Sequence, residues 1–160
     1  MKDDYTNVQF KKTDITTGND IPGAQLKITD KDGSTVAEWT TDGTPYEIDR
    51  IPAGTYTLTE TTAPDGYVVA ESVEFTVKAT GEIQTVEMKD DYTKVQIKKT
   101  DIATGEEIEG ANLKITDKDG NTVAEWTTDG TPYEIERIKT GTYTLTETTA
   151  PDGYVVAESV

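Results

Sequence analysis

Residues 24–40 read AQLKITDKDGSTVAEWT. Apolar and polar side chains alternate along Ala24–Thr29 and again along Thr35–Thr40, which is the period of a strand with one buried face. The sequence DKDG between the two runs is typical of a tight turn between paired strands. The stretch therefore predicts an antiparallel hairpin.

Similar short runs lie on both sides of this hairpin, and each is bounded by residues that favour turns. The further predicted strands are residues 8–13, 46–49, 55–62, 68–78 and 83–90, with TTGNDIPG, IPAG, APDG and ATGE in the connections. No segment carries the apolar stripe of an amphipathic helix. Seven short strands at this spacing predict an all-β fold, an Ig-like β-sandwich with one core.

The chain repeats itself at an offset of 87 residues. VQFKKTDITTG from Val8 recurs as VQIKKTDIATG from Val95, and GTYTLTETTAPDGYVVAESV from Gly54 recurs from Gly141. A unit of this length is a normal size for a small domain. The sequence therefore predicts tandem β-sandwich domains.

The repeat predicts one complete and one incomplete copy. The expected division is residues 1–6 as the tail of a preceding copy, 7–93 as a complete domain, and 94–160 as a second domain that is truncated before its last strands. The second copy stops at the equivalent of Val73, which leaves a sheet edge uncovered.

The composition excludes several classes of function. The chain has 31 acidic and 15 basic residues, a net charge of −16, and neither cysteine nor histidine. Disulfides, thiolate zinc sites and histidine catalysis are therefore excluded, and the charge disfavours nucleic acid and membrane surfaces as partners. DKDG lacks the spacing of a calcium loop, so we expect no metal and no cofactor. The start, MKDDYT, does not resemble a signal peptide.

Three ionisable residues fall in the core-facing phase of their strands. Lys12, Glu60 and Asp90 each follow two apolar residues of the same phase. Because buried charges are costly unless they are paired, the pattern suggests one shared site. The alternative is that each side chain lies at the mouth of the sandwich and reaches solvent.

A buried amine beside a buried carboxyl group has a definite chemistry. Burial favours the neutral form of both groups, so the amine could attack the carboxyl carbon and release water. Glu60 between them could carry the protons. This would be a self-reaction that occurs once per molecule, so we do not expect an enzyme.

Four segments resemble the Cna B-type, or SpaA-like, domains of Gram-positive surface proteins and pilins. They are VQFKKTD, TVAEWT, GTYTLTETTAPDGY and VEMKDDYTK. The resemblance covers residues 7–93 and, as far as that copy extends, 94–160. It implies an inverse-IgG, prealbumin-like sandwich of about seven strands, with a spontaneous isopeptide bond between its first and last strands.

The resemblance also implies a role for each residue of the site. Lys12 is the isopeptide amine, Asp90 the acceptor and Glu60 the catalytic acid. Many members of the family use asparagine as the acceptor, and an aspartate would release water in place of ammonia. Asp91 is adjacent to Asp90 but lies in the opposite strand phase.

The second copy has the equivalents Lys99 and Glu147 but no acceptor downstream in the chain. Three explanations stay open: a fragment of a longer array, a split domain that an added strand complements, and head-to-tail joining. In the third, Asp3 of one chain is the intermolecular acceptor for Lys99 of another.

The expected function is that of a stalk or pilin-type repeat in an extracellular, cell-wall-attached bacterial protein. The alternatives are an adhesin module for host matrix or glycan, and an engineered split-domain ligation scaffold. The expected partners are neighbouring repeats, host matrix proteins in the adhesin alternative, and a complementing strand for the second copy.

Overall fold

The computed structural model describes residues 4–160, and these residues form strands, turns and loops with no helix. The all-β prediction is therefore confirmed. The chain divides into two compact units between Thr93 and Lys94, and each unit is described by itself below. No helix of the described residues is long and apolar enough to cross a membrane.

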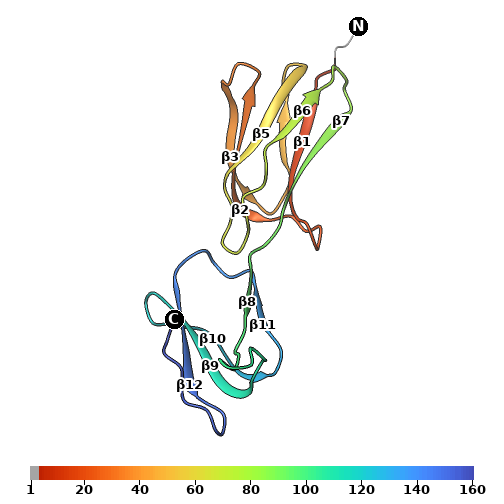
Figure 1. Cartoon of the computed structure of the whole chain (residues 1–160). Helices are drawn as coiled ribbons and strands as arrows, with labels where there is room; N and C mark the ends of the chain where they lie inside the picture. Colours follow the sequence, from red (N-terminus) through yellow and green to blue (C-terminus); the bar gives the residue numbers. More distant parts are fainter. Residues whose placement is uncertain (1–3) are drawn as a thin grey trace. The chain divides into compact units, whose positions relative to one another are not determined.

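The first unit is a sandwich of two sheets (Figure 1). The smaller sheet has the order β4-β1-β7, built from β1 (Asn7–Asp14), β4 (Tyr46–Asp49) and β7 (Ile83–Asp90). The larger sheet has the order β3-β2-β5-β6, built from β2 (Pro22–Asp30), β3 (Thr35–Asp42), β5 (Gly54–Thr62) and β6 (Val73–Val77). The first and last strands of the unit, β1 and β7, are parallel neighbours, and Lys12 is in register with Met88.

Alternation along the strands fills the space between the sheets. The largest fully buried apolar side chains come from both sheets and are Val8, Phe10, Leu26, Ile28, Leu58 and Met88. Burying a side chain of this size contributes about 1.5–3 kcal/mol. Trp39 stacks on Tyr46 with 4.3 Å between ring centroids, and its ring centroid lies 5.6 Å from that of Phe10, so Trp39 has two aromatic neighbours.

The predicted hairpin of residues 24–40 is present as the antiparallel pair β2 and β3. Asp30 closes its turn, because Oδ1 of that residue accepts the backbone N–H groups of Asp32 and Ser34, both at 2.9 Å. Gly33 has a φ of 82°, a conformation that glycine adopts without strain. Turn geometry thus accounts for the DKDG sequence.

The strand predicted over residues 68–78 is wrong in its first half, because β6 spans only Val73–Val77. The backbone before β6 makes other hydrogen bonds. The N–H of Val68 donates to the carbonyl of Asp91 at 2.9 Å, and the N–H of Ala70 donates to the carboxylate of Glu60 at 2.7 Å. These partners occupy donors that a strand ladder would need.

The second unit repeats this pattern with five strands among the described residues. They are β8 (Lys94–Ile97), β9 (Glu109–Asp117), β10 (Thr122–Asp129), β11 (Tyr133–Glu136) and β12 (Tyr143–Thr149), in sheets ordered β10-β9-β12 and β11-β8. β8 is half as long as its equivalent β1. Among the named strands, the second half of β1, Lys11–Asp14, pairs with β7 and not with β4, and the chain has no second-copy counterpart of β7.

Candidate functional site

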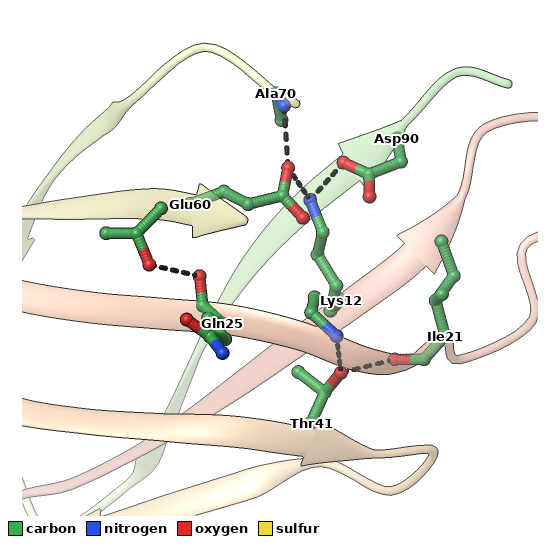
Figure 2. A network of polar contacts seen from close by, with 9 residues as sticks. Lys12, Ile21, Gln25, Thr41, Glu60, Ala70 and Asp90 are labelled. Atoms are coloured by element: carbon green, nitrogen blue, oxygen red, sulfur yellow. Dashed lines mark hydrogen bonds and ion pairs between the residues drawn. The ribbon is translucent and has the colours of Figure 1, made fainter. Parts of the chain in front are cut away.

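Three strands of the first unit bring ionisable side chains to one point in the core. β1 carries Lys12, β5 carries Glu60 and β7 carries Asp90, and the three side chains point toward one another (Figure 2). Their relative exposures are 3%, 3% and 0%. This burial rules out the alternative in which they reach solvent at the mouth of the sandwich.

The Lys12 ammonium lies between the two carboxyl groups. Its Nζ is 3.1 Å from Oε2 of Glu60 and donates a hydrogen bond to Oδ1 of Asp90. Lys12 and Asp90 are 78 positions apart in the sequence. The parallel pairing of β1 and β7 brings the two residues together, because their strands end on the same side of the sheet.

A backbone amide orients Glu60. The N–H of Ala70 donates to the same Oε2 that faces Lys12, at 2.7 Å. Within the described residues, the other oxygens of the two acids, Oε1 of Glu60 and Oδ2 of Asp90, are buried without a hydrogen-bond partner. A proton on either carboxyl group would let that group donate to the other.

The surroundings favour a proton on Asp90. The pKa of Asp90 is raised to about 6: desolvation is the largest cause, the hydrogen bond and charge of Lys12 act in the opposite direction, and the charge of Glu60 adds to the rise. The site thus holds an amine in contact with a carboxyl group that accepts a proton unusually readily. These are the reactants of an amide condensation, held together in an apolar core.

Two residues with no predicted role also belong to this region, although both lie in segments that carry the family resemblance. The hydroxyl of Tyr67 donates to Oδ2 of Asp14 at 3.0 Å, and Oδ1 of Asp14 accepts the N–H groups of Thr16 and Thr17 at 2.8 and 3.0 Å. Both residues recur in the second copy, but so do most of their neighbours, so repetition does not distinguish them. The contribution of Ala70 comes from its backbone, which leaves no side-chain signal.

The second unit contains the amine and one acid of the same site. Nζ of Lys99 is 3.0 Å from Oε2 of Glu147, and their side chains are 17% and 2% exposed. The N–H of Ala157 donates to that Oε2 at 2.6 Å. The predicted intermolecular acceptor, Asp3, lies outside the described residues.

Two comparisons relate the chain to known sequences. The family model described as SpaA, a prealbumin-like fold domain, matches residues 6–92 and 93–160. The serine-aspartate repeat-containing protein F of Staphylococcus epidermidis is 28% identical over 178 aligned positions, which cover 94% of this chain and 10% of that protein. The chain thus spans about a tenth of the length of this relative.

Solved structures show the same fold. The TIE protein of Bacillus anthracis is 31% identical with a TM-score of 0.61, and the match covers 98% of this chain and 31% of that one. BcpA, the major pilin subunit of Bacillus cereus, is 14% identical with a TM-score of 0.52, and the match covers 98% and 94% of the two chains. The prealbumin-like prediction of the fold is therefore confirmed.

Proposed function

Since the chain belongs to the SpaA family of prealbumin-like fold domains, we propose that it is a stalk-type repeat of a Gram-positive cell-surface protein. In this proposal its first unit is closed by an isopeptide bond between Lys12 and Asp90. The observation that supports the bond is the buried contact of Nζ of Lys12 with carboxyl oxygens of Asp90 and Glu60.

The reaction needs only groups of this site. A proton moves from the Lys12 ammonium to Asp90, which leaves a neutral amine and a neutral acid in contact. The amine lone pair attacks Cγ of Asp90, and Glu60 takes a proton from Nζ and passes it to the departing hydroxyl group. The Nζ–Cγ bond forms, one Cγ–O bond breaks and water leaves.

Proximity lowers the activation barrier of the reaction, which in amide synthesis without such proximity requires an activated ester. Lys12 and Asp90 are held at contact distance by the fold, so their reaction is intramolecular. The described residues contain one such set of reactants, and the chain keeps the product bond. The chain is therefore a single-turnover system and not an enzyme.

The bond would suit a protein under tension. β1 and β7 are the first and last strands of the unit, so a pull on the chain passes through both. A cross-link across a separation of 78 residues stabilises the folded state by about 4–5 kcal/mol in the chain-entropy treatment used for disulfides. It also prevents extension of the chain between the two residues, so its protection against force is kinetic as well.

Intact mass spectrometry of the purified chain tests the proposal. We expect a mass one water below that of the sequence, and a cross-linked proteolytic fragment that joins the peptides containing Lys12 and Asp90. A Lys12→Ala chain should have its full sequence mass, whereas the matched Lys99→Ala chain should still lose one water. An unmodified chain with its full sequence mass would contradict the proposal.

A further inference from the structure

The orientation of Glu60 depends on a loop outside the strands. Oε2 of Glu60 faces Nζ of Lys12 at 3.1 Å and accepts the N–H of Ala70 at 2.7 Å. Ala70 lies between β5 and β6, in a stretch that joins no strand ladder. The direction in which the Glu60 carboxylate points is thus set by where this stretch holds the amide of Ala70.

The Tyr67 hydroxyl ties this stretch to the end of β1. It donates to Oδ2 of Asp14, the last residue of β1, at 3.0 Å. Asp14 is 3% exposed, and its other oxygen already accepts two backbone N–H groups, so its carboxylate cannot rotate freely. Tyr67 is therefore anchored to β1, the strand that carries Lys12; Lys12 precedes Asp14 by two residues. We call this Asp14–Tyr67 contact the clamp.

Hydrogen bonds to residues after β7 also hold the loop in the first unit. The N–H of Val68 donates to the carbonyl of Asp91 at 2.9 Å, and the N–H of Thr93 donates to the carbonyl of Gly66 at 3.0 Å. These bonds could hold the loop without the clamp. The second unit separates the two contributions, because the chain has no second-copy counterpart of Asp91 or Thr93.

The second unit keeps the clamp and the orientation of its glutamate. The hydroxyl of Tyr154 donates to Oδ2 of Asp101 at 3.0 Å, the same distance as in the first unit. The N–H of Ala157 reaches Glu147 at 2.6 Å, and Glu147 reaches Lys99 at 3.0 Å. The lysine–glutamate half of the site therefore has its geometry without the acceptor strand.

We propose that Asp14 and Tyr67 are positioning residues for amide formation. They fix the loop whose Ala70 amide aims Glu60 at the Lys12 amine, before β7 brings Asp90 into contact. The inference rests on the proposed function, because it concerns the rate of that bond. Since small displacements of reacting groups cost large factors in rate, loss of the clamp should slow bond formation by about 10- to 100-fold.

The test follows bond formation in the newly made chain of 160 residues. Wild-type and Tyr67→Phe chains are produced by cell-free translation, translation is stopped, and aliquots are quenched in acid for intact mass measurement. We expect Tyr67→Phe to lose the same water, but about 10- to 100-fold more slowly. Tyr154→Phe makes the same chemical change in the second unit, and it should react at the wild-type rate.

A conservative replacement distinguishes positioning from general destabilisation. Asp14→Asn keeps an oxygen for the two backbone amides and a polar group for Tyr67, so it should react much faster than Asp14→Ala. Adding Tyr67→Phe to Asp14→Ala should slow the reaction no further, because each change alone already removes the same Tyr67–Asp14 hydrogen bond. In chains that also carry Lys12→Met, urea unfolding measures what Tyr67→Phe does to stability when no bond forms.

The outcomes separate the two claims. A wild-type chain that never loses water would overturn the proposed function. If the wild-type chain loses water and Tyr67→Phe reacts at the same rate, the clamp has no positioning role. Loss of stability in the Lys12→Met background together with an unchanged rate of bond formation would likewise reduce the clamp to a structural contact.

Discussion

Replacing Glu60 with glutamine alters the charge of the site and preserves the size of the side chain. The amide oxygen of the new side chain can still accept the N–H of Ala70, which lies 2.7 Å from Oε2 of Glu60. The amide cannot take a proton from the Lys12 amine. We therefore expect the Glu60→Gln chain to fold and to keep its full sequence mass.

The size of the effect on stability follows from the cross-link. The bond closes a separation of 78 residues, which corresponds to about 4–5 kcal/mol of stabilisation through the unfolded state. For a domain of this size each kcal/mol shifts the melting temperature by about 4–8 °C, so the first unit should melt about 16–40 °C lower. Loss of the negative partner of Lys12 adds to this difference.

Intact mass and differential scanning calorimetry measure the two effects on the same sample. Glu147→Gln is the matched control, because it makes the same change beside Lys99, where the chain offers no acceptor. It should lose one water like the wild type and leave the melting of the first unit unchanged. A Glu60→Gln chain that loses water would refute the role of Glu60. An unbonded Glu60→Gln chain that melts at the wild-type temperature would refute the loop-closure reasoning.

Three further predictions concern stability. In a Lys12→Met chain Asp90 stays unbonded, and its folded-state pKa, raised to about 6 by desolvation even with Lys12 present, exceeds the unfolded value of 3.8. The folded state then binds the proton more tightly, so the free energy of unfolding in urea should fall by about 2–3 kcal/mol as the pH rises from about 4 to about 7; a flat profile would contradict the burial of Asp90. Leu58→Ala, at a fully buried position, should cost about 2–5 kcal/mol when made in that same Lys12→Met chain, whereas Leu145→Ala should cost the second unit less because Leu145 is only half-buried; equal losses in calorimetry would show that the two cores are equally tight. Limited trypsin digestion of the wild-type chain should cut after Lys99 well before it cuts within residues 13–89. Equal resistance of the two units would contradict the looser packing of the second unit.

The alternation of apolar and polar residues was sufficient to predict most strands and the side chains that face the core. The hairpin of residues 24–40, the short strand Tyr46–Asp49 and the last strand Ile83–Asp90 have the predicted bounds or nearly so. The same alternation indicated that Lys12, Glu60 and Asp90 face the core, where the structure buries them. Side-chain phase is a local property, and a short sequence run determines it.

Features that depend on distant backbone partners could not be predicted in this way. Val68–Ser72 has the composition of a strand, but its amides bond to Asp91 and to the Glu60 carboxylate. Lys98–Asp101 repeats the sequence of Lys11–Asp14 at the end of β1 without change, yet it is not a strand, because its pairing partner is absent from the chain. Identical local sequence thus gives different structure when the neighbouring strand differs.

The parallel pairing of β1 and β7 has a consequence for which sequence changes such a module can tolerate. Lys12 and Asp90 lie toward the ends of adjacent strands, and with the bond formed a pull enters along Asn7–Lys12 and leaves directly after Asp90. Every loop between them then lies off the line of force. Insertions and substitutions in those loops would leave the breaking strength of the unit untouched, so its surface is free to diversify while its mechanics stay constant.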